Sequence, residues 1–347
     1  MNNYQYRDVS IDILRGLAIL LMVAAHISDD ILIRPHPKWL CFGSYAAPLF
    51  ILISGMMVTL TAKTKGHKLK YFLLRGITII AFGAFVDLFI WKIYPLSSVD
   101  VLYLIGFSIP LAYIFLHLNN WYQWIIVISV FSLTPVFQKV LGYTDYPTEI
   151  YLGENFKILF ENPINILNHW IIDGWFPIFP WLGFSFLGII FANFRWKNSS
   201  TNLFCKKSFF FVGLCLFIIG CLLWKIYPVK LIYRESEADL FYPPTPPYIL
   251  TAIGLILILF PIVDYKSSLV IYHPLQILGK SSLFIYILHL FFIEYIITRF
   301  WSETDLQTSF IIFLILLCVL ILIAYGLKIL KNKWKVRFFI IRVLIGA

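Results

Sequence analysis

Arg15 and His26 stand eleven residues apart in the first apolar segment of the chain. Eleven residues make close to three helical turns, so a helix projects both side chains from nearly the same face, about 16 Å apart along its axis. Ionisable groups inside an apolar segment are costly and by default indicate function. An arginine in this position can bind an anion, and a histidine can act as a general base or as a nucleophile.

Each of these residues also has a plain structural explanation. Asp12 lies three residues before Arg15, and a pair at that spacing can neutralise its own charges at the start of a helix. A lone histidine in a helix is most often a structural hydrogen-bonding group. His26 differs in being followed by Asp29 and Asp30, and an acidic neighbour orients an imidazole ring in the way that a general base requires.

The composition indicates that membrane-spanning helices position these residues. The 347 residues are 60% hydrophobic and only 13% charged, whereas a soluble domain carries roughly 25% charged residues. Ten segments are apolar and long enough to approach the roughly 20 residues that cross a bilayer. They cover residues 11–28, 45–61, 71–91, 99–116, 121–137, 174–194, 208–227, 247–263, 281–298 and 309–330. We therefore predict an all-α polytopic bundle of ten or eleven spans, forming a single transmembrane domain over residues 1–347.

Two stretches need a separate interpretation, namely the first apolar segment and residues 163–173. The first apolar segment is interpreted as a retained span rather than a cleaved signal peptide, because charged residues interrupt its approach and its apolar stretch is long. The stretch 163–173 is polar enough to be a re-entrant or interfacial piece.

The five cysteines indicate neither a disulfide framework nor a metal site, because their number is odd and there is no Cys-x-x-Cys pair.

Charge predicts the orientation. The chain has 28 Lys and Arg against 18 Asp and Glu, a formal charge of +10. If the N-terminus is cytoplasmic, most of the basic residues flank inner span ends and most of the acidic ones fall on the outer half, which predicts two cytoplasmic termini. This distribution accounts for the net charge without a nucleic-acid partner. The basic tail from residue 331 onward is expected on the anionic lipids of the inner leaflet.

Six motifs follow one another along the chain. They are the stretch 7–26 and the sequences GSYAAPLFILISG (43–55), DVLYLIG (100–106), FPIFPWLG (176–183), YPPTPPY (242–248) and LGKSSLFIYILH (278–289). In this order they resemble the motifs of a superfamily of integral membrane acyltransferases. The superfamily includes the acyltransferase-3 proteins and the heparan-α-glucosaminide N-acetyltransferase-like proteins (the DUF1624 group), and the second group is the nearer match.

The resemblance implies transfer of an acetyl group from cytoplasmic acetyl-CoA to a sugar amine or hydroxyl on the far side of the membrane. His36 and Trp39 match a His-x-x-Trp that follows the first span in the heparan-type enzymes, whose histidine is implicated in catalysis. His26 matches a histidine of acyltransferase-3 proteins, where the heparan-type enzymes have asparagine. The chain carries both catalytic candidates, and we favour His26 over His36. Direct transfer and an acetyl-histidine intermediate both stay open.

Binding of acetyl-CoA requires cations for its phosphates at the inner end of the bundle. Arg15, Lys70 and Arg75 are the candidates. Acyltransferase-3 proteins have basic residues at the corresponding start of the third span. The alternative for Arg75 is an arginine that snorkels from a span end to the interface.

The acceptor-binding candidates lie towards the outer side. Asp29, Asp30 and Asp173 can bind sugar hydroxyls or an ammonium group, and Trp39 can stack on a sugar ring. For Asp173 a helix cap or an interfacial ion pair is the alternative. Further residues share this outer position with less support: Asp87, Asp100, Trp175 and Glu294.

Other functions compete with this interpretation. O-acylation of a surface polysaccharide or lipid-linked glycan would use the same residues, and so would a transporter of a small anion or sugar. The absence of a recognisable internal repeat disfavours the transporter. No metal is required, the partners are acetyl-CoA, a glycan and membrane lipids, and the oligomeric state is open, a homodimer included. The composition favours a prokaryotic plasma membrane.

Overall fold

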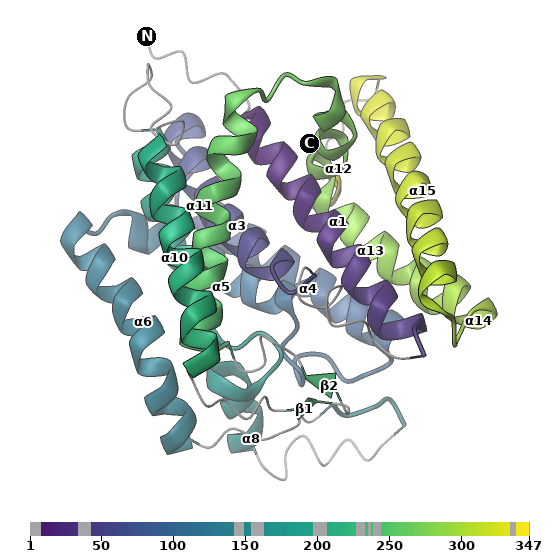
Figure 1. Ribbon diagram of the computed structural model, residues 1–347, viewed down its shortest axis with the longest axis horizontal. Coiled ribbons are helices and arrows are strands. Elements are labelled where there is room, and N and C mark those ends of the chain that lie inside the picture. Colours follow the sequence, from purple (N-terminus) through teal and green to yellow (C-terminus); the bar gives the residue numbers. More distant parts are fainter. Residues whose placement is uncertain are drawn as a thin grey trace.

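Long helices make up nearly all of the computed structural model (Figure 1). The structure describes residues 8–33, 43–141, 149–153, 163–196, 207–226, 233–234, 237–238, 244–333 and 338–346. Within these ranges, nine helices are long and apolar enough to cross a membrane. The long helices are α1 (Val9–Ile31), α3 (Ala46–Lys65), α4 (Leu69–Val86), α6 (Asn120–Leu141), α9 (Ile178–Arg195), α10 (Lys207–Ile226), α11 (Pro246–Tyr265), α13 (Ser282–Phe292) and α15 (Leu306–Lys333).

Two of these spans are lengthened by π-helical turns. α4 continues as η1 (Asp87–Trp91), and α13 continues as η5 (Ile293–Ile297) and α14 (Thr298–Phe300). A tenth apolar helix, α5 (Val101–Leu116), is shorter. Together they correspond to the ten segments that hydropathy predicts, so the all-α polytopic fold is confirmed.

Several short elements connect the spans. The stretch expected to be irregular forms α8 (Pro163–Asn168) and η2 (His169–Asp173), and β1 (Tyr233–Arg234) pairs with β2 (Glu237–Ala238) in an antiparallel hairpin. The turn η4 (Val270–Tyr272) leads into α12 (His273–Lys280), and α16 (Phe339–Ile345) follows α15. Hydropathy did not predict α12 or α16, because each is only about two turns long and therefore too short to form an apolar span.

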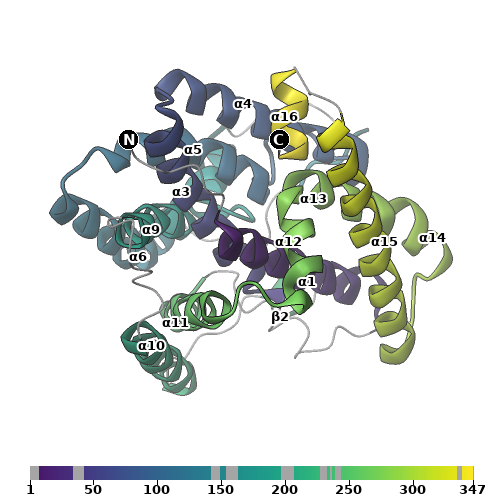
Figure 2. The same ribbon diagram turned by 90° about the horizontal axis from the view of Figure 1, so that it is seen from above.

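α1 runs through the middle of the bundle (Figures 1 and 2). It contacts α3, α11, α12, α13 and α15. The stripe Ile19, Val23, Ile27 and Ile31 recurs every four residues and packs into a hydrophobic cluster with α12, α13 and α15. Ile11, Leu14 and Ala18 belong to a second cluster with α3, α5, α9 and α11. α1 therefore packs against both hydrophobic clusters. Its polar residues Arg15, His26 and Asp29 face the space between these clusters.

Glycines permit the closest helix contacts. A Cβ on Gly279 of α12 would lie 1.9 Å from the Asp12 carbonyl oxygen of α1, and a Cβ on Gly16 would lie 1.9 Å from the Leu275 carbonyl oxygen. Small residues at such crossings let helix backbones approach within a membrane. The short helix α12 is in this way held directly against the start of α1.

An ion cluster ties three helix ends together. The Arg195 guanidinium at the end of α9 donates to Asp8 Oδ2 at 2.6 Å and to Asp264 Oδ2 at 2.6 Å. Asp8 caps the first turn of α1, and Asp264 lies in the last turn of α11. The Arg195 and Asp264 side chains are almost fully buried. These three ends therefore lie at one side of the bundle, as the charge distribution predicts for the cytoplasmic side.

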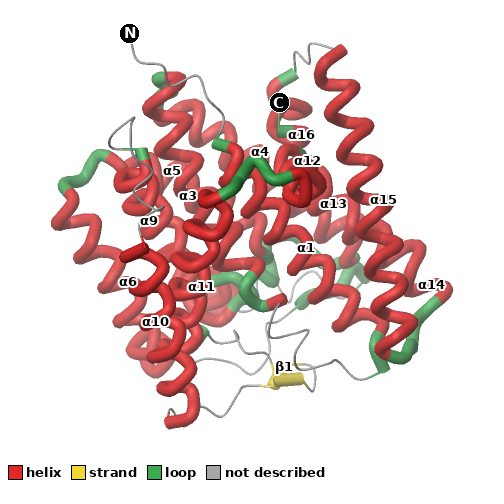
Figure 3. Tube along the Cα trace, turned by 45° about the horizontal axis from the view of Figure 1, so that its top comes forward, coloured by secondary structure: helices red, strands yellow, loops and turns green. Residues whose placement is uncertain are grey.

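The C-terminal helix packs at this same end. α16 contacts α13 and α4, and Figure 3 shows it beside α13. Lys331 Nζ donates to Ser281 Oγ at 2.9 Å and to the Ile345 carbonyl. α16 and the residue after it reach the cavity described next, at the end where Arg15 lies.

Candidate active site

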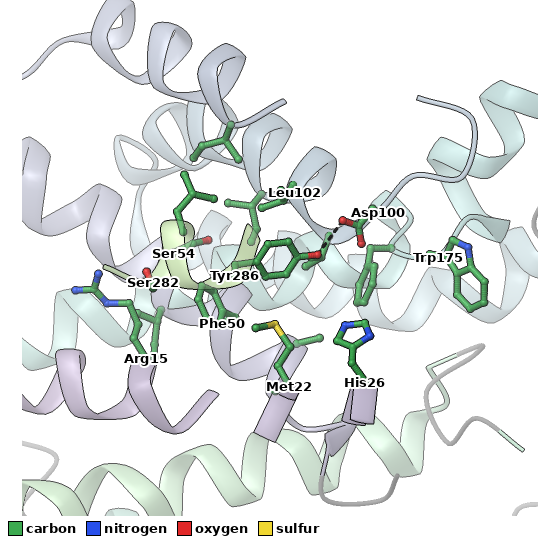
Figure 4. Close-up of a pocket in the computed structure, with 18 of the residues that line it drawn as sticks. Arg15, Met22, His26, Phe50, Ser54, Asp100, Leu102, Trp175, Ser282 and Tyr286 are labelled. Carbon is green, nitrogen blue, oxygen red and sulfur yellow. Dashed lines mark hydrogen bonds between the residues drawn. The ribbon is translucent and has the colours of Figure 1, made fainter. Parts of the chain in front are cut away.

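A cavity of about 770 Å³ lies between α1, α3, α4, α5 and α13. The polar stripe of α1 forms one wall, with Arg15, Met22, His26 and Asp29 recurring at helical spacing. In Figure 4, Arg15 and Ser282 lie at one end and Trp175 lies towards the other end, and between them lie Phe50, Tyr286, His26 and Asp100. The shared helical face that spacing predicts for Arg15 and His26 is therefore the face that lines the cavity.

The first end of the cavity is basic. Arg15 Nη2 donates to Asp12 Oδ1 at 2.6 Å, and the Asp12 side chain is fully buried. Arg75 lies in α4, and its Nη1 donates to the Tyr71 hydroxyl at 3.3 Å. Both arginines line the cavity, and Gly346 after α16 lines it as well. The structural pair of Asp12 and Arg15 thus exists, and it leaves Arg15 on the cavity wall.

Two histidines meet in the middle. The ring of His26 lines the cavity, and the fully buried ring of His289 from α13 lies with its centroid 5.3 Å away. His289 Nδ1 is 3.3 Å from the Ile285 carbonyl oxygen. A carbonyl oxygen only accepts, so this nitrogen carries the proton. His289 Nε2 has no hydrogen-bond partner among the described residues.

A tyrosine and a carboxylate complete the middle section. The Tyr286 hydroxyl donates to Asp100 Oδ2 at 3.0 Å, and both residues line the cavity. The Tyr286 ring also packs edge-on against His289, with centroids 5.5 Å apart. Asp100 directly precedes the first residue of α5. The contact links the two spans that carry the motifs at 100–106 and 278–289.

The second end is acidic and aromatic. Four carboxylates line it: Asp29, Asp30, Glu149 and Glu294. The Trp175 indole Nε1 donates to Glu149 Oε1 at 2.6 Å, and the Tyr151 hydroxyl donates to Glu149 Oε2 at 3.3 Å. Carboxylates can accept hydrogen bonds from the hydroxyl and ammonium groups of a sugar. Aromatic rings can pack against its apolar faces.

Only some of the predicted site residues line the cavity. Five line this one cavity: Arg15, His26, Asp29, Asp30 and Arg75. Lys70 is exposed at the start of α4 and does not line the cavity. Asp173 is buried, does not line this cavity, and accepts a hydrogen bond from His169 Nδ1 at 2.7 Å within the π-helical turn η2. His36 and Trp39 lie outside the described residues.

Part of the cavity lining could not be predicted from hydropathy. Glu149 and Tyr151 lie in a polar connection that carries no hydropathy signal. Tyr286 lies within the motif at 278–289, and this motif is the sequence feature from which its place at the site could have been predicted. In the described ranges, no group of three or more His, Cys, Asp or Glu side chains is arranged to hold a metal ion.

Comparison with known proteins identifies the family. The family model described as "Heparan-alpha-glucosaminide N-acetyltransferase, catalytic" matches residues 7–230, which is more than half of the chain. No curated protein matches the chain. The matched range contains Arg15, His26, Arg75 and Asp100, and the resemblance to acyltransferase-3 proteins stays a prediction. The chain, a bundle of apolar helices with this cavity, thus belongs to the heparan-alpha-glucosaminide N-acetyltransferase family and is a membrane acetyltransferase.

Proposed function

We propose that this protein moves an acetyl group from cytoplasmic acetyl-CoA to an amine or hydroxyl of a sugar on the other side of the membrane. The observation that carries the proposal is one continuous cavity with arginines at one end, a histidine in the middle and carboxylates at the other end. Such a cavity brings two substrates of opposite charge to one reactive group. The surrounding membrane is proposed to be a prokaryotic plasma membrane.

Arg15 and Arg75 bind phosphates of the acetyl donor. Arginine presents a planar set of donors that matches phosphate oxygens, and it stays charged when partly buried. Lys70 lies one turn of α4 before Arg75 and is exposed. It adds long-range attraction for the nucleotide at the rim rather than a contact inside the cavity.

His26 takes the proton of the acceptor. In direct transfer the acceptor nitrogen or oxygen attacks the thioester carbonyl, the C–S bond breaks, and the proton held by His26 passes to the CoA thiolate. In the two-step route an imidazole nitrogen of His26 attacks the thioester carbonyl, and the CoA thiolate leaves and takes up the imidazole proton. The acceptor then attacks the acetyl-imidazole, the C–N bond to His26 breaks, and the acceptor proton returns to the imidazole. His36 remains the alternative catalytic residue.

The carboxylates Asp29 and Asp30 bind the acceptor. They line the cavity beyond His26, on the same helix. A negatively charged rim attracts an ammonium group and accepts hydrogen bonds from sugar hydroxyls. The rings of Trp91 and Trp175 line this end too and offer apolar faces for the sugar.

Calorimetric titration of the detergent-purified protein with acetyl-CoA and with free CoA tests the proposal. We expect micromolar binding that weakens on the order of 10- to 100-fold in Arg75→Ala, because hydrogen bonds to charged groups contribute about 1.5–3 kcal/mol. Lys65→Ala is the matched control, since Lys65 is exposed near the same end and does not line the cavity. Absence of acetyl-CoA binding in protein shown to be folded would reject the proposal.

A further inference from the structure

A second cavity, of about 610 Å³, opens between the ends of α3, α5, α6 and α9. It shares no lining residue with the first cavity. Its walls come from the turn between α3 and α4, the end of α5, the start of α6 and the end of α9. Arg195 ends α9 at the same side, so this cavity lies at the basic end of the bundle.

The lining of this cavity is basic. Lys63, His67, Lys68 and His117 line it, and no Asp or Glu occurs among its lining residues in the part of the chain that the structure describes. Lys63 Nζ donates to the neutral Asn193 Oδ1 at 2.9 Å. Two ammonium groups without a carboxylate between them leave a positive potential that an anion can neutralise.

The back wall of the cavity is fixed by a buried amide. Gln123 is almost completely buried, and its Nε2 donates to the carbonyl oxygens of Phe115 at 3.1 Å and Leu118 at 3.2 Å. These bonds satisfy carbonyls near the end of α5, whose negative helix end would otherwise repel an anion. α6 begins at Asn120, which lines the cavity, and the partial positive charge of a helix N-terminus favours an anion there.

The outer face of α6 is suited to lipid. Trp121 is 73% exposed and Trp124 is 38% exposed, and Trp124 also lines the cavity. One turn further along, Ile125 and Ile128 are exposed as well. α6 lies at the edge of the bundle beside α9 (Figures 1 and 2). Tryptophans at a helix end beside basic residues occupy the headgroup level of a bilayer, and isoleucines beyond them face the acyl chains.

We propose that this second cavity binds the phosphate of an anionic phospholipid headgroup, with the acyl chains lying along the exposed face of α6. Lys63 and Lys68 pair with the phosphate, and Trp124 packs against the glycerol region. Basic pockets between membrane helices on the cytoplasmic side are recognised lipid sites. A soluble phosphate compound shares the charge of the headgroup but lacks acyl chains to cover α6.

Native mass spectrometry of the detergent-purified protein tests this proposal, with phosphatidylglycerol and phosphatidylcholine as probes. We expect one phosphatidylglycerol to be retained in preference to phosphatidylcholine. The Lys63→Gln/Lys68→Gln variant should bind phosphatidylglycerol about 30-fold more weakly, since each of the two lysines near a lipid surface contributes about 1 kcal/mol. Lys63→Arg/Lys68→Arg should retain binding.

The matched control removes equal charge elsewhere at the same end. Lys65 and Lys266 do not line the cavity, so Lys65→Gln/Lys266→Gln should bind as the unmodified protein does. Equal affinity for the two lipids, or unchanged binding in Lys63→Gln/Lys68→Gln, would overturn the proposal. Displacement of phosphatidylglycerol by micromolar glycerol phosphate or CoA would overturn it in favour of a soluble ligand. Thermal unfolding checks that each variant is folded. If the double variant is unfolded, the single variant Lys68→Gln replaces it, because Lys68 lies on an exposed turn. These lipid measurements are independent of acetyl transfer.

Discussion

His26 has a different environment on its two sides. It lines the large cavity, while the ring of His289 lies 5.3 Å from it between centroids and is fully buried. The ring of Trp91 is also near, with centroids 6.3 Å apart. A histidine held between rings and open to substrates on one side has the fixed orientation that proton transfer requires.

We expect His26→Gln to reduce acetyl transfer by roughly 10²- to 10⁴-fold, the usual contribution of a general base. Acetyl-CoA affinity should stay near that of the unmodified protein, because the amide replaces the imidazole without touching Arg15 or Arg75. Initial rates with glucosamine as acceptor and calorimetric titration separate the two effects. Retained activity in His26→Gln together with loss in His36→Ala would assign catalysis to His36.

His289 is expected to act as a positioning residue for His26. Its Nδ1–H is directed to the Ile285 carbonyl, and glutamine can donate a similar hydrogen bond whereas leucine cannot. His289→Leu should therefore lower kcat about tenfold or more with little change in the KM for acetyl-CoA, and His289→Gln should retain most of the activity. Equal kcat in both variants would show that the contact does not matter.

At the scale of elements, the contact between α1 and α12 depends on one glycine. A Cβ on Gly279 would lie 1.9 Å from the Asp12 carbonyl oxygen, which is backbone and cannot rotate away. Gly279→Ala should therefore lower the free energy of unfolding by about 1–3 kcal/mol or more, the cost of overpacking. Thermal unfolding in detergent measures this loss.

Gly326 of α15 provides the control for Gly279→Ala. No atom lies within 4 Å of a Cβ at this position among the described residues. Gly326→Ala should leave the unfolding temperature unchanged or raise it slightly, because alanine is favoured over glycine inside a helix by roughly 1 kcal/mol. Similar destabilisation in both variants would argue against the close crossing.

The cluster of Arg195 with Asp8 and Asp264 makes a second element-scale prediction. Removal of the guanidinium leaves two carboxylates close together, with Asp264 fully buried. Arg195→Leu should destabilise the protein by about 3–5 kcal/mol, as expected when one partner of a buried ion pair is removed. Thermal unfolding of Arg195→Leu and of Arg195→Leu/Asp264→Leu checks the cause. The double variant should regain part of the stability, and no recovery would point to lost packing instead.

At the scale of the whole molecule, the cavity joins two groups of residues of opposite charge. Ser282 lines it near Arg15 (Figure 4), and Tyr151 lines it beside Glu149. In a variant whose native cysteines are replaced, Ser282→Cys and Tyr151→Cys should react with a membrane-impermeant maleimide from opposite sides of oriented vesicles. Acetyl-CoA should slow the labelling of Ser282→Cys much more than that of Tyr151→Cys. Labelling of both from one side would contradict a cavity shared across the membrane.

Much of the fold was predictable from the sequence because each span is a continuous apolar run. The segment 11–28, for example, falls inside α1, and the segment 45–61 begins one residue before α3 and ends within it. α12 was not predictable in the same way, because its eight residues owe their position to contacts with α1 and α15 rather than to their own hydropathy. The burial of Asp173 could not be predicted either, because its hydrogen-bond partner His169 is only one of several polar residues nearby in the sequence.

The sequence by itself determined the class of fold, the family and the stripe of α1 that carries Arg15, His26 and Asp29. Helical periodicity and hydrophobicity are local properties, so they can be read from neighbouring residues. Only the tertiary structure decided that Arg75, Tyr286 and Glu149 meet this stripe around one cavity. Their meeting depends on how helices distant in the chain cross, and those crossings are set by close backbone contacts and buried ion pairs that no local pattern encodes.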